Sequence, residues 1–290
     1  MTHRRLMPES ERPQTPDLDQ LIAEYDCWLL DAYGVLLDDA GALPGAVDLL
    51  RRLDAAGKPW LVVTNSASRL PETLSHDWAA AGIVIDPARI LTSGSLLAGY
   101  FAAAGLSGAR CLFLGPPESR AYVERAGGQP VQPSPAADTE VVVVADQKQV
   151  RWPEDLDDTV SLILRRVDAG RPLHLLLCNP DLIYPVAPGR YGFTAGGIAS
   201  MLEAVIRERY PTRKLGFTRL GKPYPPLFER ARERLGTGRL LMVGDQLGTD
   251  IQGAVHTGID SLLVCTGLAP RGDPADWPVR PTWVLPSLAD

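Results

Sequence analysis

Short apolar segments alternate with amphipathic helical segments along most of the chain. Strands that are apolar on both faces and separated by helices are typical of parallel sheets covered on both sides. The pattern therefore predicts a doubly wound α/β protein. The apolar segments expected as strands are 27–34, 59–68, 89–94, 111–116, 140–146, 173–181, 240–246 and 261–267.

Helical segments between these strands carry recognisable end signals. In 44–57 we expect Pro44 just inside the helix and Gly57 just after it. The middle of the chain, from about 107 to 190, shows strand–helix alternation of its own. It also contains the proline-rich segment 127–140, which we expect to be a long connection. We interpret the middle as an inserted domain, with the first and last thirds folding together.

Composition and charge argue against two classes of partner, nucleic acids and membranes. The chain has 290 residues and a formal net charge of −6, and its arginines are scattered at helical spacing rather than gathered in a basic block. We therefore expect no nucleic acid as a partner. No run approaches the roughly 20 apolar residues of a membrane span, so we expect no membrane partner. The first 20 residues lack the apolar region of a secretory signal.

The cysteines indicate the compartment. They lie in or beside apolar runs and have no CxxC spacing. We expect reduced, buried thiols in a cytoplasmic protein rather than a disulfide or zinc framework. They are Cys27, Cys111, Cys178 and Cys265.

Polar residues stand where predicted strands end. Asp31 ends the first apolar run, and Thr64 and Asn65 end the second. Taken singly, Asp31 fits a turn cap and the Thr64–Asn65 pair fits a helix N-cap. A hydroxyl and an amide at a helix start can also bind an oxyanion. Because ligands bind beyond the carboxyl ends of parallel strands, we expect these side chains to converge.

Two later features extend this set. Lys222 precedes a proline expected to begin a helix, where a cation is unfavourable unless an anion binds too; a solvated surface lysine is the alternative. Asp245 and Asp250 follow a predicted strand and are separated by a glycine-bearing loop. Two close carboxylates repel each other, and Mg²⁺ prefers oxygen ligands. The pair therefore predicts a Mg²⁺ site.

In this order, an aspartate, a threonine, a lysine and GDxxxxD resemble the motifs of the haloacid dehalogenase superfamily. The segments TNSASR (64–69), CNPD (178–181) and 244–267 resemble its class IIA, NagD-like branch, as does the tail 280–290. The resemblance covers residues 25–290. It implies a Rossmann-like core of 1–105 and 192–290, with a large inserted α/β cap of 106–191.

The resemblance also implies an activity and roles for residues. It implies a Mg²⁺-dependent phosphatase of small phosphate esters that acts through an aspartyl-phosphate on Asp31. Asp31, the Tyr33 carbonyl and Asp245 would hold Mg²⁺, with support from Asp250. The groups that would bind the phosphoryl group are Thr64 and Lys222. We interpret Asp38 and Asp39 as flap or turn residues.

The rest of the substrate is expected between cap and core. Besides Asn65, the candidates there are residues of 178–197, and each fits a turn or packing role equally well. They are Asn179, Asp181, Tyr184, Arg190 and Tyr191. A homodimer formed through the cap fits this branch.

Tyr33 departs from the family pattern. Phosphatases of the superfamily usually carry an aspartate there, which protonates the leaving alcohol and later activates water. A phenol can donate a hydrogen bond but is a poor base at neutral pH. Two alternatives therefore stay open: a phosphate-ester binding or regulatory protein without turnover, and a halide-displacing hydrolase. DAYGVL resembles the first motif of 2-haloacid dehalogenases, but these need no metal, and the retained Asp245 and Asp250 oppose that alternative.

Overall fold

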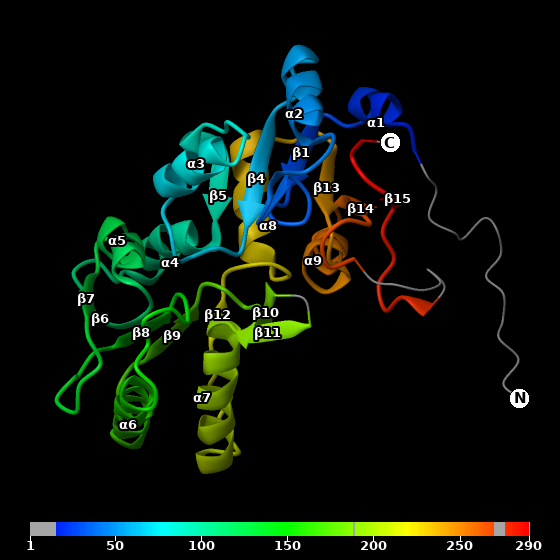
Figure 1. Cartoon of the computed structure of the whole chain (residues 1–290). Coiled ribbons are helices and arrows are strands. Elements are labelled where there is room, and N and C mark those ends of the chain that lie inside the picture. The colour runs from blue at the N-terminus through cyan, green and yellow to red at the C-terminus, as the bar shows by residue number, and fades with distance from the viewer. Residues whose placement is uncertain (1–15, 188, 270–275, 290) are drawn as a thin grey trace, which may run out of the picture. The chain divides into compact units, whose positions relative to one another are not determined.

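The computed structural model describes residues 16–187, 189–269 and 276–289, and its elements can be followed in Figure 1. Residues 1–15 of the segment tested for a secretory signal lie outside the described residues. The chain divides into two compact units. The core unit contains the chain up to Thr64, Glu72–Leu91 and the part from Pro223 on; the inserted unit contains Asn65–Pro71 and Thr92–Lys222.

The core unit is built on one sheet with the strand order β15-β14-β13-β1-β4-β5 among the described residues. β1 pairs in parallel with β4 and β13, and β14 pairs in parallel with β13 and β15. β1, β4 and β13 are buried throughout, as strands covered on both faces must be. The strands are β1 (Cys27–Leu30), β4 (Trp60–Thr64), β5 (Ile90–Thr92), β13 (Leu240–Gly244), β14 (Asp260–Val264) and β15 (Trp283–Leu285). The predicted doubly wound α/β core is confirmed.

Helices cover this sheet with apolar faces. Leu21 of α1, Leu49 of α2 and Trp78 of α3 join the buried strand residues in one apolar core. α8 packs against β4, and α9 packs against β14. Gly45 is the N-cap of α2, so Pro44 precedes the helix rather than lying inside it. The helices are α1 (Leu18–Glu24), α2 (Ala46–Ala55), α3 (Pro71–Ala80), α8 (Pro225–Leu235) and α9 (Gln252–His256), with the 3₁₀ turn η2 (Pro87–Arg89) before β5.

A small hairpin follows β1. It consists of β2 (Leu37–Asp38) and β3 (Gly41–Ala42), and the Ala40 N–H donates to Asp38 Oδ1 at 2.8 Å. Asp38 ends β2 and Asp39 lies in the turn, and both side chains are exposed. These positions agree with their interpretation as flap or turn residues.

The amino edge of the core sheet holds a polar network between distant segments. The Tyr25 hydroxyl donates to Asp260 Oδ2 at 2.9 Å, and the Trp283 indole N–H donates to the same hydroxyl at 2.8 Å. Arg239 lies over the Tyr25 ring at 4.5 Å and bonds to Asp260. Burial raises the pKa of Tyr25 to about 12. The network therefore ties α1 to the start of β14 and to β15.

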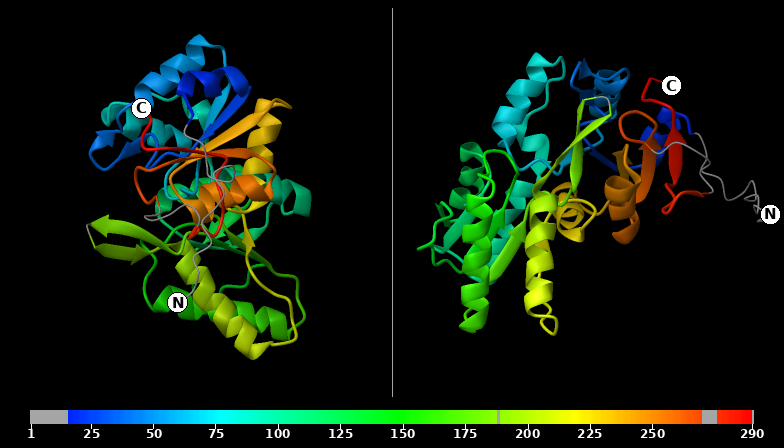
Figure 2. Two further views of the ribbon diagram at one scale, coloured as in Figure 1. Left: turned by 90° about the vertical axis from the view of Figure 1, so that its right-hand side faces the viewer. Right: turned by 60° about the horizontal axis from the view of Figure 1, so that its bottom comes forward.

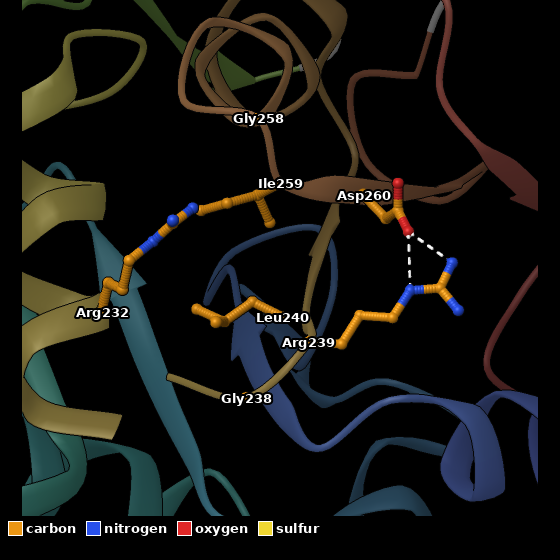
Figure 3. Close-up of a pocket in the computed structure, with 7 residues that line it drawn as sticks. All are labelled: Arg232, Gly238, Arg239, Leu240, Gly258, Ile259 and Asp260. Atoms are coloured by element: carbon orange, nitrogen blue, oxygen red, sulfur yellow. Dashed lines mark hydrogen bonds and ion pairs between the residues drawn. The ribbon is translucent and has the colours of Figure 1, made fainter. Parts of the chain in front are cut away.

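A hollow of about 240 Å³ lies beside this network, where β13 and β14 begin (Figure 3). Arg239 and Asp260 line it, and their charges are paired with each other. Polar residues that follow parallel strands lie at the opposite, carboxyl edge of the sheet. This hollow therefore lies at the amino edge of the sheet and is not the candidate site.

Loss of the Tyr25 hydroxyl is expected to destabilise the core unit. Tyr25→Phe leaves the Trp283 N–H and Asp260 without that buried partner, which costs about 1–3 kcal/mol. Urea denaturation followed by tryptophan fluorescence measures the loss. Tyr33→Phe is the matched control, because Tyr33 is 48% exposed. Equal unfolding midpoints for wild type and Tyr25→Phe would show that the hydrogen bonds of Tyr25 do not stabilise the core unit.

The inserted unit has a parallel sheet of its own, with the order β12-β9-β8-β6-β7 among the described strands. Helices α6 and α7 lie side by side (Figure 2). A separate antiparallel hairpin consists of β10 (Ile183–Ala187) and β11 (Arg190–Phe193). The other elements are β6 (Arg110–Leu114), β7 (Gln129–Val131), β8 (Val141–Val144), β9 (His174–Leu177), β12 (Thr218–Arg219), α4 (Leu97–Ala104), α5 (Arg120–Arg125), α6 (Glu154–Asp168), α7 (Ala195–Arg209) and the 3₁₀ turns η3 (Ser93–Leu96) and η4 (Pro117–Ser119).

The limits of the inserted unit differ from the expected 106–191. α7 lies after that range, yet its residues Ile198 and Leu202 share one apolar core with Leu175 of β9. β12 extends the same sheet by pairing with β9. The segment 127–140 is not a plain connection either, because β7 lies within it and pairs with β6.

The structure also bears on the expectations about membrane spans and about the burial of the cysteines. Within the described ranges, no helix combines the length and apolar composition needed to cross a bilayer. Cys27, Cys111 and Cys178 are buried as predicted, and the prediction for Cys265 is wrong, because its side chain is exposed just after β14.

Candidate active site

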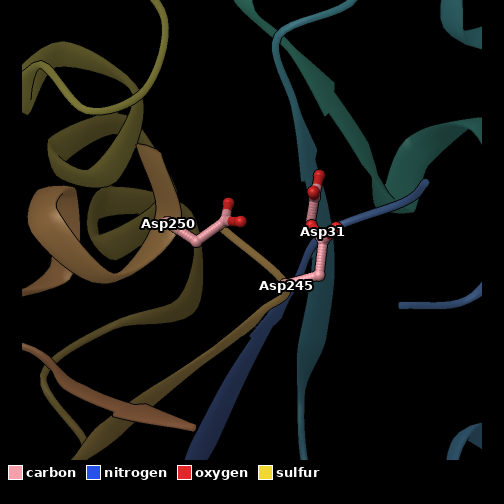
Figure 4. A group of neighbouring side chains, drawn as sticks. All are labelled: Asp31, Asp245 and Asp250. Atoms are coloured by element: carbon pink, nitrogen blue, oxygen red, sulfur yellow. The ribbon is translucent and has the colours of Figure 1, made fainter. Parts of the chain in front are cut away.

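Three aspartates of the core unit gather at the carboxyl ends of its central strands (Figure 4). Asp31 follows β1 and Asp245 follows β13, which pairs with β1 through Leu30 and Val243. Carboxylate oxygens of Asp31, Asp245 and Asp250 all lie within 4.8 Å of one another. The three residues are 6%, 1% and 0% exposed. The structure therefore brings Asp31 together with two side chains that lie more than 200 positions later in the sequence.

Asp250 comes from a short helical turn rather than from an open loop. The turn η5 (Leu247–Ile251) has π-helical geometry and directly precedes α9. The Gln246 N–H donates to Asp250 Oδ2 at 3.2 Å. A Cβ atom on Gly244 would lie 2.2 Å from the Asp250 Cβ. The side chain of Asp250 is thus folded back over the end of β13.

Two glycines enclose the carboxylate of Asp245. Gly34 has φ of +87° and Gly267 has φ of +59°, a region that favours glycine. A Cβ atom would lie 2.4 Å from Asp245 Oδ2 at Gly34 and 2.3 Å from it at Gly267. The Leu268 N–H donates to this oxygen at 2.6 Å. The contacts of Gly267 and Leu268 with Asp245 were not predicted. The sequence Thr266–Gly267 after a predicted strand was the signal that could have indicated them.

The donor set fits a divalent cation. Carboxylates this close repel one another, and burial strengthens the repulsion because the surroundings screen charge poorly. Hard cations such as Mg²⁺ prefer oxygen ligands and would offset that repulsion. Among the described residues, this is the group of acidic, histidine or cysteine side chains whose ligand atoms are close enough to share one ion.

The other predicted residues of the core unit lie near the same strand ends. Thr64 is the last residue of β4, which pairs with β1, and it is 6% exposed. Tyr33 lies two residues beyond Asp31 and is 48% exposed. The helix expected to begin after Thr64 and Asn65 begins only at Pro71. The reading of this pair as a plain helix N-cap is therefore wrong, and so is the expectation that a helix start beside the pair favours an oxyanion there.

In the inserted unit, two predicted residues bond to the Asn65 amide, and a third bonds to one of these two. Asn65 Nδ2 donates to Asp181 Oδ1 and to the Lys222 carbonyl, both at 2.9 Å, and Oδ1 accepts from the Lys222 N–H at 2.6 Å. A Cβ atom on Gly221 would lie 2.4 Å from Asn65 Oδ1. The Asp181 N–H donates to Asn179 Oδ1 at 3.0 Å. The Asn65 amide thus fixes the main chain at Lys222.

Lys222 is 2% exposed, so the alternative of a solvated surface lysine is wrong. The helix after it begins at Pro225 with Tyr224 as N-cap, two residues later than expected. Tyr184 and Tyr191 lie on the hairpin β10–β11 and are 39% and 62% exposed. Arg190, at the start of β11, is exposed as well.

The cysteines at strand ends are unsuited to nucleophilic attack. Burial raises the pKa of Cys178, which follows β9, to about 12. Cys265, which follows β14, is exposed, but partial desolvation still raises the pKa of its thiol. Both thiols therefore stay protonated at neutral pH, and a protonated thiol is a weak nucleophile. The carboxylates therefore remain as the candidate nucleophiles.

The fold and this centre define a class: a doubly wound α/β protein with an acidic, cation-fitting centre at the carboxyl edge. A family model described as haloacid dehalogenase-like hydrolase matches residues 28–129, and one described as HAD-hydrolase-like matches 219–290. The chain therefore belongs to the haloacid dehalogenase-like hydrolases, in their class IIA, NagD-like branch. The predicted family resemblance is confirmed.

Individual relatives align with nearly the whole chain. It is 26% identical to the dihydroxyacetone phosphatase of Corynebacterium glutamicum, over 91% of this chain and 89% of the relative. It is 25% identical to the ribonucleotide monophosphatase NagD of Escherichia coli, over 90% and 96%. A solved structure from Cytophaga hutchinsonii, described as a "possible sugar phosphatase" of the HAD superfamily, superposes with a TM-score of 0.81 at 29% identity, over 96% of this chain and 99% of that one.

Proposed function

We propose that this hydrolase is a Mg²⁺-dependent phosphatase of small phosphate esters. The observation that carries the proposal is the buried cluster of Asp31, Asp245 and Asp250, whose oxygens lie within 4.8 Å. Relatives that align over most of their own length are named as phosphatases, which supports the ester class. The cytoplasmic location and a homodimer stay predictions.

Asp31 is proposed as the nucleophile. Its carboxylate oxygen forms a bond to phosphorus, the bond from phosphorus to the ester oxygen breaks, and the leaving oxygen takes up a proton. Water then attacks the phosphorus of the aspartyl-phosphate, which releases phosphate and restores the carboxylate. Thr64 and Lys222 are proposed to bind the oxygens of the transferring group.

Charge explains why this set of residues suits the reaction. An anionic carboxylate and a phosphate dianion repel each other, so positive charge must lie near both. Mg²⁺, when bound, supplies part of that charge, and Asp31, the Tyr33 carbonyl and Asp245 would hold it, supported by Asp250. The ammonium of Lys222 supplies the rest.

We propose that Asn65, Asn179 and Asp181 bind substrate or position the groups that do. Asn65 bonds to both the N–H and the carbonyl of Lys222, so it fixes the lysine's main chain. The inserted unit is proposed to act as the family's cap, which excludes water during the transfer.

The direct test is phosphate release from a panel of aryl, alkyl and sugar phosphates, with and without Mg²⁺. Release that depends on Mg²⁺ supports the proposal. Binding of esters without release from any of them would overturn it. That outcome would favour the second candidate, a phosphate-ester binding protein, which the tyrosine at position 33 already suggests.

Mg²⁺ is expected to stabilise the core unit. Binding to the native state at about 100 times the dissociation constant adds about 2.7 kcal/mol, so the melting temperature should rise by several degrees. Asp245→Asn should remove most of this rise, and should stabilise the metal-free protein because one repelling charge is lost. Differential scanning calorimetry measures both effects. Asp39→Asn, in the exposed turn after β2, is the control. A wild-type protein that Mg²⁺ does not stabilise would contradict the metal assignment.

A further inference from the structure

The segment that follows β14 reaches two loops of the acidic centre in the core unit. β13 lies between β14 and β1 in the sheet. The Cys265 N–H still donates to a carbonyl of β15 at 2.9 Å, which continues the sheet by one residue beyond β14. Residues 266–268 instead contact residues that follow β13 and β1. This segment therefore crosses the carboxyl end of β13, where Asp245 lies.

Thr266 fixes the loop that follows β1. Its hydroxyl donates to the Gly34 carbonyl, and the Gly34 N–H donates to the Leu37 carbonyl at 2.9 Å. Gly34 has φ of +87° and no side chain that restricts its backbone. The two hydrogen bonds therefore hold the peptide groups on both sides of this glycine. Because a peptide group is planar, the bond from the Gly34 N–H also orients the Tyr33 carbonyl.

The same segment holds the carboxylate that follows β13. The Leu268 N–H donates to Asp245 Oδ2 at 2.6 Å. A Cβ atom on Gly267 would lie 2.3 Å from that oxygen and 2.7 Å from the Gly34 Cα. The missing side chain at Gly267 therefore lets the segment lie against both loops at once. Segment 266–268 thus contacts one proposed Mg²⁺ ligand directly and fixes the loop that carries another, the Tyr33 carbonyl.

A site for Mg²⁺ requires ligands that keep fixed positions. Mg²⁺ demands near-octahedral geometry and tolerates little variation in its distances to oxygen. Groups that orient the ligands without touching the ion therefore contribute to affinity. The half-buried Thr266 is placed to do this, because its hydroxyl joins the segment that contacts Asp245 to the loop that follows Asp31.

We infer that Thr266 is a positioning residue for Mg²⁺ binding at the acidic centre. Its hydroxyl holds the Gly34 carbonyl while the Leu268 N–H holds Asp245, so the segment fixes the separation of the two loops that supply ligands. This role requires no contact of Thr266 with the ion or the substrate. The inference rests on the proposed function, because it concerns the affinity of the same site for Mg²⁺.

The test measures Mg²⁺ binding by isothermal titration calorimetry in the absence of substrate. Thr266→Val removes the hydroxyl but nearly keeps the shape of the side chain. It should raise the dissociation constant for Mg²⁺ by about tenfold, the lower end of the range for groups that orient metal ligands. Thr266→Ala also lacks the hydroxyl and should give the same loss. Thr266→Ser keeps the hydroxyl and should stay within about threefold of the wild type.

The Mg²⁺ dependence of phosphate release gives a second measurement. In Thr266→Val, the Mg²⁺ concentration at half-maximal rate should rise by about the same tenfold factor. The rate at saturating Mg²⁺ should fall by less than about threefold, because the residues proposed to react are all retained. A loss confined to the saturated rate would contradict a role in binding the ion.

Thr257→Val is the matched control and should leave the dissociation constant unchanged. The Thr257 hydroxyl also donates to a backbone carbonyl of the core unit, that of Gly253 at 2.8 Å, and the residue is half-buried like Thr266. The melting temperature in EDTA shows that each variant is folded. Wild-type affinity in folded Thr266→Val and Thr266→Ala proteins would overturn the inference, and so would an equal loss in Thr266→Ser.

Failure of the inference and failure of the proposed function give different results. Wild-type protein that binds no Mg²⁺ would overturn the metal assignment and this inference together. Wild-type protein that binds Mg²⁺ with an affinity that does not depend on the Thr266 hydroxyl would overturn the inference alone. A protein that shows the expected order of affinities but releases no phosphate would contradict the phosphatase activity and support the role of Thr266.

Discussion

Asp31→Asn is expected to lower turnover of every phosphate ester by about 10⁴–10⁶-fold, the range seen when an enzyme loses its nucleophile. The amide keeps the size of the side chain but removes the attacking charge. Binding of the ester should persist or tighten, since repulsion between carboxylate and phosphate is relieved. Phosphate release and calorimetric binding are the two measurements.

Asp38→Asn is the matched control for this substitution. Asp38 is exposed at the end of β2, seven positions along the chain, and its change should leave turnover within about twofold of the wild type. The melting temperature of each variant shows that it is folded. An Asp31→Asn protein with more than a few per cent of wild-type activity would rule out an aspartyl-phosphate on this residue.

The second large effect concerns the residue two positions later. General acid–base catalysis is worth about 10²–10⁴-fold, and Tyr33 offers no carboxylate to protonate the leaving oxygen. Aryl phosphates, whose leaving groups need no proton, should therefore be turned over faster than alkyl phosphates by about that factor. Tyr33→Asp should raise the rate for the alkyl ester toward that for the aryl ester. Because Tyr33 is 48% exposed, the smaller side chain opens no buried cavity.

Tyr33→Phe is the control that isolates the phenol. If the hydroxyl donates no proton to the leaving group, this variant keeps the wild-type ratio of aryl to alkyl rates. A selective fall in the alkyl rate would instead assign the proton to Tyr33 itself. Equal wild-type rates on the two esters, with no gain from Tyr33→Asp, would mean that another residue supplies the proton.

The tyrosine at position 33 should also slow the second step, the hydrolysis of the aspartyl-phosphate. Without a carboxylate at position 33, water is activated slowly and the aspartyl-phosphate on Asp31 should accumulate. Acid quenching during turnover of an aryl ester should trap phosphorylated protein, preceded by a burst of the phenol product. Tyr33→Asp should shorten the lifetime of this species. A burst of equal size and decay in both proteins would contradict the role assigned to this position.

Much of the core follows from local pattern. The apolar runs before Asp31, Thr64 and Asp245 are strands buried on both faces, and parallel strands present their carboxyl ends at one edge. Convergence of these residues could therefore be predicted without coordinates. The order of the polar residues along the chain was enough to indicate the family, which the family models confirm.

Features that depend on contacts between distant segments could not be read in this way. Gly34 and Gly267 both lie against the Asp245 carboxylate, but the sequence around one glycine does not indicate that the other is close to it. The inserted unit continues to Lys222 because the two-residue strand β12 pairs with β9, a signal too short to recognise. Element bounds near Pro44 and Pro223 also moved, because α2 begins at Ala46 and α8 at Pro225.

Residue type and spacing thus indicate the fold class, the family and the sheet edge at which the aspartates meet, because burial of an apolar run is a local property and parallel strands end at one edge of their sheet. The state of a single polar side chain depends on what packs around it in space. Lys222 is buried with its main chain held by Asn65, and Asp146 is buried without an ion pair while Asp155 has one. These differences arise from the folded surroundings, since the same residue types in the unfolded chain are all solvated alike.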